Sequence, residues 1–354
     1  MAHGFGRRLV SGLICMVLIY LRAFVASFEP QVPCYFIFGD SWVDSGNNNQ
    51  LVTKAKVNYP PYGVDFPEGS TGRFTNGRTI ADIIGQFLGF NKFIPSYASV
   101  RDKVITTGVN YGSGSAGIRE ESGSVMGDRI SLDKQLLHHK SIISRLPRWK
   151  RKSRFLQQCI YIVNMGSNDY SNNFFFPGVY NTSSIYTDEQ YAEVLIQQYS
   201  QQLKTLYKLG GRKIVVFSLA LLGCSPVYIA RFGTKGKPCV EPVNNAVKLF
   251  NRRLLSLIRE LNSNYSHARF TFINLESILS PVGDVPMSHE PCCELKNEWQ
   301  CIPNSAPCPV REFSFFFDGF HPAEISNMII ATRAYTAFSP TDAHPYDISH
   351  LAQL

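Results

Sequence analysis

The sequence predicts an α/β sandwich with a mainly parallel sheet. Short apolar runs typical of buried strands alternate with longer segments whose apolar residues recur at helical spacing. Such an alternation places a helix between successive strands, which is the arrangement that produces a parallel sheet covered on both faces. With 354 residues, 44% of them hydrophobic, and no internal repeat or linker, the chain has enough apolar material for one large domain.

The elements follow one another in a regular order. The expected helices include Thr79–Leu88, Glu189–Leu209 and Pro242–Leu261. The expected strands are Tyr35–Phe38, Val104–Tyr111, Ile160–Met165, Lys213–Leu222 and Arg269–Leu275. The first three strands each end just before a group of small and polar residues. Because open α/β sheets bind ligands beyond the carboxyl ends of their strands, we expect the functional site there.

The first 27 residues have the pattern of a secretory signal peptide. Arg7 and Arg8 form a basic start, residues 9–21 form an apolar stretch, and Val25-Ala26-Ser27 provides the small residues of a cleavage site. A membrane anchor is the alternative, but the apolar stretch is short for a membrane span, so we expect no stable membrane insertion. Residues 28–354 are then the single mature domain.

Two short segments at opposite ends of the chain supply the parts of a nucleophilic hydrolase. Gly39-Asp40-Ser41 follows the first apolar run, and Asp318-Gly319-Phe320-His321 lies near the C-terminus. A serine hydroxyl becomes a nucleophile when a base takes its proton, and a histidine is an effective base when a carboxylate orients it. The sequence therefore predicts Ser41 as nucleophile, His321 as base and Asp318 as its partner.

Two further segments offer donors for a developing oxyanion. Residues 108–117 form a Gly/Ser-rich loop after the second strand, and Gly166-Ser167-Asn168-Asp169 follows the third. A glycine N–H and an asparagine amide are suitable donors for a tetrahedral intermediate. Neighbouring polar residues receive structural interpretations: Asp40 as a hydrogen-bonding residue and Asp169 as a residue that orders its loop. The aromatic run Phe174–Phe176 would either line an acyl pocket or pack in the core.

Taken together and in this order, the four segments resemble the plant-type GDSL esterase/lipases of the SGNH hydrolase superfamily. The flanking motifs Asp44-Ser45-Gly46-Asn47-Asn48 and Gly72-Arg73-Phe74-Thr75-Asn76-Gly77-Arg78 match as well, and the resemblance runs from about Tyr35 to the end of the chain. It implies a flavodoxin-like α/β/α arrangement of the sheet, and it implies the same roles for Ser41, Asp318 and His321.

The resemblance also implies an oxyanion hole made by the Ser41 N–H, a glycine of the second segment and Asn168. Gly114 and Gly117 both fit the glycine position, and Gly117 is favoured because the family segment usually ends in a glycine there. This chain has Trp42 where the family motif continues with leucine. Because that position follows the nucleophile, we expect Trp42 to alter the shape of the pocket and to leave the chemistry intact.

Eight cysteines remain after the predicted signal peptide, an even number that favours disulfides in an oxidising compartment. Cys224 with Cys239 would close one loop, and the four cysteines between residues 292 and 308 would cross-link the loop ahead of Asp318. Zinc is the alternative for that late cluster, although its spacing lacks paired C-x-x-C motifs. Cys34 and Cys159 could be either bonded or free core thiols.

Other features concern location and partners. Asn181 and Asn264 begin glycosylation triplets, which fits a secreted, extracellular protein of the cell wall or apoplast. The net charge is +8, and the densest basic cluster, residues 145–154, could contact an acidic polysaccharide or remain a solvated loop. Secretion and the absence of a binding motif argue against nucleic acid.

The predicted function is hydrolysis of a carboxylic ester, in a lipid or another acylated substrate, by a serine esterase or lipase. The chemistry requires no metal or organic cofactor. Two alternatives use the same scaffold. One is an acyltransferase, in which an alcohol takes the acyl group. The other is a catalytically silent binding protein.

Overall fold

The computed structural model describes residues 29–152, 154–280 and 289–354. The predicted signal peptide, residues 1–27, therefore lies outside the described residues. Within them, four parallel strands and one short antiparallel edge strand form the main sheet in the order β1-β2-β3-β4-β7. The strands are β1 (Tyr35–Gly39), β2 (Ile160–Asn164), β3 (Lys213–Phe217), β4 (Arg269–Ile273) and β7 (Ala343–His344).

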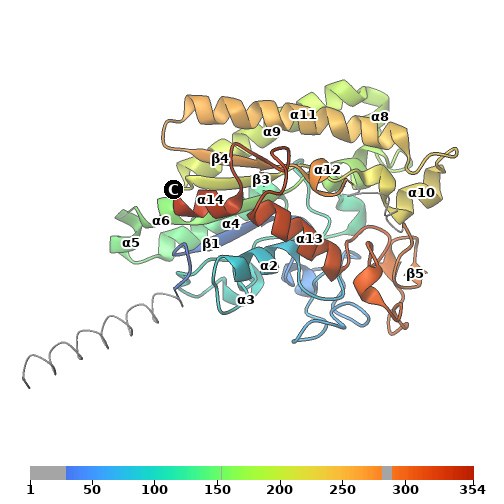
Figure 1. Cartoon of the computed structure of the whole chain (residues 1–354), viewed down its shortest axis with the longest axis horizontal. Helices are drawn as coiled ribbons and strands as arrows, with labels where there is room; N and C mark the ends of the chain where they lie inside the picture. The colour runs from blue at the N-terminus through green and yellow to red at the C-terminus, as the bar shows by residue number, and fades with distance from the viewer. Residues whose placement is uncertain (1–28, 153, 281–288) are drawn as a thin grey trace, which may run out of the picture.

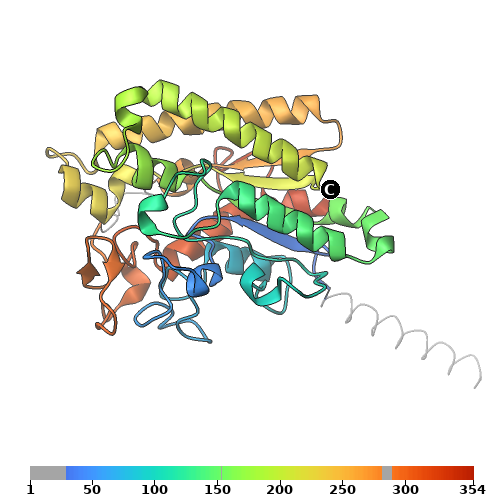
Figure 2. The ribbon, with the colours of Figure 1, turned by 180° about the vertical axis from the view of Figure 1, so that it is seen from behind.

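Helices cover both faces of this sheet, so the predicted three-layer α/β sandwich is confirmed (Figures 1 and 2). The layer on one face contains α4 (Leu132–Arg145), α9 (Asp188–Lys208) and α11 (Glu241–Asn264). The other face is covered by α2 (Ile80–Phe87), α12 (Leu275–Ile278), α13 (Glu324–Tyr335) and α14 (Ile348–Gln353).

Alternation along the strands assigns side chains to the two layers. In β1, Phe36 and Phe38 pack toward α4, α9 and α11, whereas Tyr35 and Ile37 pack toward α2 and α13. The residues of β1 and β2 are buried throughout, as expected for parallel strands covered on both faces. This double burial explains why the first and third predicted strands are close to the observed ones.

The remaining elements are shorter. The structure contains α3 (Tyr97–Val100), α5 (Arg148–Lys152), α6 (Phe155–Gln158), α7 (Ser167–Asp169), α8 (Thr182–Ile185) and α10 (Pro226–Phe232), together with a β5 (Leu295–Lys296) and β6 (Gln300–Cys301) hairpin. Five further short helical turns are η1 (Asn47–Gln50), η2 (Ser124–Met126), η3 (Tyr170–Phe174), η4 (Leu222–Cys224) and η5 (Arg311–Phe313). None of the described helices is long and apolar enough to cross a membrane.

The second predicted strand, Val104–Tyr111, is not a regular strand. The segment runs along the free edge of β1, where Ile37 donates its N–H to the Val109 carbonyl and Ile37 and Asn110 form a parallel bridge. Gly108 has φ 123°, and a Cβ there would lie 1.8 Å from the Tyr35 carbonyl oxygen, so the pleat is interrupted. Counted with this segment, the parallel order matches the flavodoxin-like arrangement.

All eight cysteines of the described residues are bonded, in four pairs. The pairs are Cys34–Cys159, Cys224–Cys239, Cys292–Cys308 and Cys293–Cys301. The interpretation of Cys34 and Cys159 as free thiols is wrong, because the two residues lie at adjoining ends of the paired strands β1 and β2. The zinc alternative for the late cluster is also wrong, because its four sulfurs are bonded to one another and cannot act as thiolate ligands.

Candidate active site

Ser41 lies just beyond the carboxyl end of β1. Gly39 ends the strand where the chain turns, and a Cβ at this position would lie 2.6 Å from the Asn164 carbonyl oxygen, so the close approach to β2 requires glycine. Asp40 then fixes the turn, since its side chain accepts the Trp42 N–H and its carbonyl accepts the Val43 N–H. These bonds hold Ser41 at the sheet edge, where the residue keeps 8% of its surface exposed.

His321 and Asp318 complete a hydrogen-bonded line with Ser41. The Nε2 atom of His321 lies 2.8 Å from Ser41 Oγ, and its Nδ1 atom lies 2.8 Å from Asp318 Oδ2. Asp318 Oδ1 also accepts the backbone N–H groups of Phe320 and His321, so one turn carries both residues in a fixed relation. The sequence separates Ser41 from His321 by 280 residues, and the fold brings them into contact.

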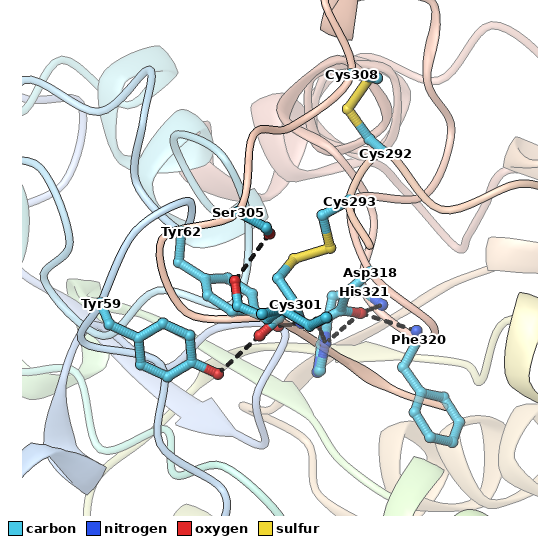
Figure 3. Close-up of a disulfide and its surroundings, with 11 residues drawn as sticks. Tyr59, Tyr62, Cys292, Cys293, Cys301, Ser305, Cys308, Asp318, Phe320 and His321 are labelled. Atoms are coloured by element: carbon cyan, nitrogen blue, oxygen red, sulfur yellow. Dashed lines mark hydrogen bonds and ion pairs between the residues drawn. A yellow bond between two sulfur atoms is a disulfide. The ribbon is translucent and has the colours of Figure 1, made fainter. Parts of the chain in front are cut away.

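A tyrosine that the sequence did not single out holds the other side of Asp318. Tyr62 donates its hydroxyl to Asp318 Oδ2 at 2.7 Å, and the same hydroxyl accepts the Cys301 N–H at 3.0 Å. Figure 3 shows this contact beside the Cys293–Cys301 disulfide, which fixes the Cys301 backbone. Burial raises the pKa of Tyr62 well above its usual value, so the phenol keeps its proton and remains a donor to the carboxylate.

A small cavity of about 40 Å³ opens beside Ser41 and His321. Asn168 lies in its wall, with its Nδ2 donating to the Ala116 carbonyl at 2.9 Å and its Oδ1 accepting the Asn172 amide. These two bonds fix the amide orientation and leave one N–H of Asn168 for a ligand. The structure thus places Asn168 beside Ser41.

The Gly/Ser-rich segment contributes Ser115 to this cavity. Gly114 donates its N–H to Asp44 Oδ2, and a Cβ on Gly117 would lie 2.8 Å from Asp169 Oδ1, so both glycines are used in packing the loop. Neither glycine lines the cavity, whereas Ser115 does. Ser115 has φ 67°, an unusual conformation for a residue with a side chain, and its N–H has no partner within the described part of the chain.

The neighbouring polar residues are structural, as the sequence predicted for Asp169. Asp169 accepts the N–H groups of Ile118 and Arg119 and so orders the loop after Gly117. Arg73 forms a buried ion pair with Asp82 at 2.7 Å. Phe174 and Phe175 pack against Tyr170, which confirms the core-packing interpretation for these two residues, whereas the Phe176 ring faces the Arg231 guanidinium at 5.2 Å.

Asp40 is the buried acid next to the nucleophile, and its ionisation should affect stability. Burial raises the pKa of Asp40 to about 7, and its Oδ2 atom has no hydrogen-bond partner within the described residues. The folded state therefore retains a proton that the unfolded state, with a pKa near 3.9, has already released. This contribution to stability is present below about pH 4 and is lost as the pH rises toward 7.

The Asp40→Asn variant removes this titration and allows it to be measured. We expect the variant to gain stability relative to the parent protein as the pH rises from 4 to 7, by up to about 4 kcal/mol. His139, whose pKa burial lowers to about 3, acts in the opposite direction but is present in both proteins, so its effect cancels in the difference. Urea unfolding at several pH values measures that difference, and parallel stability curves would show that Asp40 does not titrate in this range.

Comparison with known proteins identifies the family. The model of the GDSL-like lipase/acylhydrolase family matches residues 35–334. Two GDSL esterase/lipases of Arabidopsis thaliana are each 44% identical to the chain; one alignment covers 96% of both proteins, and the other covers 96% of this chain and 98% of the relative. Among solved structures, an extracellular lipase from Streptomyces rimosus is 15% identical, with a TM-score of 0.34, over 85% of this chain and 100% of that one.

The family match covers most of the chain, and the relatives span nearly all of it at more than 40% identity. The four motifs of the sequence and the α/β sandwich agree with it. The chain therefore belongs to the GDSL-like lipase/acylhydrolase family, and it is a carboxylic ester hydrolase.

Proposed function

We propose that the protein is a secreted serine esterase or lipase in which Ser41, His321 and Asp318 form the catalytic triad. The observation that carries this proposal is the continuous line of short contacts from Ser41 Oγ through the His321 ring to Asp318. This geometry matches the requirement that the nucleophile, the base and the residue orienting the base lie within hydrogen-bond reach of one another.

The reaction follows from these positions. His321 Nε2 takes the Ser41 proton as Ser41 Oγ attacks the ester carbonyl, while Asp318 holds the ring with its Nδ1 proton directed at the carboxylate. The resulting imidazolium then gives its proton to the leaving alcohol. Water attacks the acyl-enzyme by the same route, with His321 again acting first as base and then as acid.

The oxyanion would receive three donors. Ser41 N–H and Ser115 N–H have no partner within the described residues, and Asn168 Nδ2 has one N–H to spare. The cavity position of Ser115 supports it as the backbone donor in preference to Gly114 and Gly117, whose contacts lie elsewhere. Preorganised donors of this kind typically contribute about 100- to 1000-fold each to the rate of acyl transfer.

Secretion and a single mature domain remain part of the proposal. Four disulfides suit an oxidising compartment, and both glycosylation acceptors, Asn181 and Asn264, are exposed. Arg148 and Arg154 are exposed in the basic cluster, as a contact with an acidic polysaccharide requires. Peptide mass spectrometry of protein from the culture medium tests the processing and the glycans directly.

Release of p-nitrophenol from short p-nitrophenyl esters by the purified, disulfide-bonded protein tests the proposed reaction. We expect multiple turnovers with water as the acceptor. Product analysis with and without added alcohol separates hydrolysis from acyl transfer. Folded protein that consumes no ester would contradict the proposal, and product formed only when an alcohol is present would identify an acyltransferase.

A further inference from the structure

A second, larger cavity adjoins the catalytic one. It has a volume of about 570 Å³, against about 40 Å³ for the cavity beside Ser41. The two cavities share three wall residues, which are Trp42, Leu222 and Phe320. Trp42 directly follows the nucleophile, and Phe320 directly precedes the histidine base, so residues next to the reacting centre form the wall between the two cavities.

The walls of the larger cavity are mostly apolar. Leu279, Phe315, Phe316 and Ile330 contribute aliphatic and aromatic surface. Of its few polar lining groups, His289 is engaged through Nδ1 with the Cys224 carbonyl at 2.8 Å, and the Glu276 carboxylate pairs with Lys248. A site of this composition favours a hydrocarbon group and offers little to a sugar or a charged ligand.

The two cavities differ in which part of an ester substrate they can hold. A cavity of about 40 Å³ has room for a few water-sized groups, enough for the reacting carbonyl and its oxygen but not for a long chain. Any extended aliphatic part of the substrate has to occupy adjoining space. The larger cavity is the apolar space that shares its wall with the catalytic one.

We propose that this cavity binds the aliphatic chain of the ester substrate and that Trp42 controls the passage into it. The proposal rests on the proposed esterase function and assigns the substrate class, which is esters with a long hydrocarbon chain. The chain can belong to the acyl group or to the alcohol, and both have the same apolar chemistry. Leucine, the residue that the family motif has at position 42, is smaller than Trp42 and would leave a wider passage.

Chain-length dependence follows from the burial of methylene groups. Each methylene that leaves water for an apolar site gains enough free energy to raise kcat/KM by about 4-fold, provided the gain persists in the transition state. For the unmodified protein, kcat/KM should therefore increase with chain length until the cavity is filled and then level off.

The experiment compares two ester series below their micelle concentrations. The first varies the acyl chain of p-nitrophenyl esters from acetate to laurate, and the second varies the alcohol of acetate esters from ethanol to dodecanol. The variant Ala220→Phe reduces the volume of the cavity from its own wall. Ala230→Phe is the matched control, because Ala230 is exposed on α10 and lies outside the lining.

The quantity compared is the ratio of kcat/KM for the longest chain to kcat/KM for the shortest chain. In one of the two series, Ala220→Phe should lower this ratio by at least about 10-fold, because the variant excludes two or more methylene groups from the cavity. Trp42→Leu should raise the same ratio or move its maximum to longer chains. Ala230→Phe should leave it unchanged. Thermal unfolding of each variant verifies the fold, and Trp42→Leu carries the test if Ala220→Phe does not fold.

The outcomes also separate this inference from the proposed function. A ratio that changes in the acyl series identifies the chain as the acyl group, and a change in the alcohol series identifies it as the alcohol. Acetate hydrolysis with ratios unaffected by Ala220→Phe and Trp42→Leu in both series would overturn the inference and leave the esterase proposal standing. If the unmodified protein hydrolyses no ester of either series, the proposed function itself is overturned.

Discussion

Replacing Ser41 by alanine should lower kcat for ester hydrolysis by roughly 10⁴- to 10⁶-fold. The substitution removes the attacking oxygen, and loss of the nucleophile in a Ser-His-Asp enzyme removes most of the rate enhancement at once. The only hydrogen bond that Ser41 Oγ forms in the described part of the chain is the contact with His321, so the fold should be retained. Activity against a p-nitrophenyl ester and the thermal midpoint, measured on the same preparation, check both expectations.

A matched substitution controls for the general effect of removing a hydroxyl. Ser144 is exposed on α4, where its hydroxyl donates to the Ser141 carbonyl of its own helix. Ser144→Ala should retain the activity of the parent protein. If Ser41→Ala kept substantial activity while folded, the nucleophile would have to be a different residue.

Replacing Asp318 by asparagine should lower kcat by about 10⁴-fold, the second largest effect that we expect. Asparagine keeps an oxygen that can accept the N–H groups of Phe320 and His321, so the turn should persist. Its NH2 group then takes the place of Oδ2, 2.8 Å from His321 Nδ1, and donates to that nitrogen. The ring therefore adopts the tautomer with its proton on Nε2, which cannot take the Ser41 proton. Steady-state kinetics should show the loss in kcat, with KM little changed.

Tyr62→Phe provides a graded comparison at the same carboxylate. The phenylalanine keeps the ring but removes the hydrogen bond to Asp318 Oδ2 and leaves the Cys301 N–H without this acceptor. Because Tyr62 acts through Asp318, it is a positioning residue. We expect a reduction of about 10-fold in kcat, consistent with one hydrogen bond to a charged group, and an unchanged KM. A purely structural role would lower the thermal midpoint without changing kcat at a permissive temperature.

An effect of Asp318→Asn no larger than that of Tyr62→Phe would contradict the role of Asp318 as the carboxylate that orients the base.

The sequence predicted the parts of the site whose signals are local. Ser41 and Asn168 follow continuous apolar strands, and Asp318 and His321 lie on one turn, so a short window contains the information for each. The alternation of strands and helices similarly predicted the layers. In these places, burial on both faces of a parallel sheet enforces an unambiguous pattern.

Features that depend on contacts between distant segments could not be read in this way. Tyr62 meets Asp318 across 256 residues, and Cys34 meets Cys159 across 125. No pattern within a short stretch of sequence predicts either contact. The predicted strand Val104–Tyr111 has strand-like composition, yet Gly108 breaks it because the Tyr35 carbonyl lies too close for a side chain. The Ser115 N–H likewise depends on a backbone conformation that composition does not specify.

Covalent labelling with a fluorophosphonate is the measurement that tests the account most directly. The reagent phosphonylates a serine activated by a neighbouring base, and peptide mass spectrometry locates the modified residue. The cavity is also lined by Ser115, Ser167 and Ser171, so three other serines are available to react in place of Ser41. The account predicts one label, on Ser41, with loss of ester hydrolysis in proportion to labelling. A label on another serine, or folded protein that remains unlabelled, would contradict it.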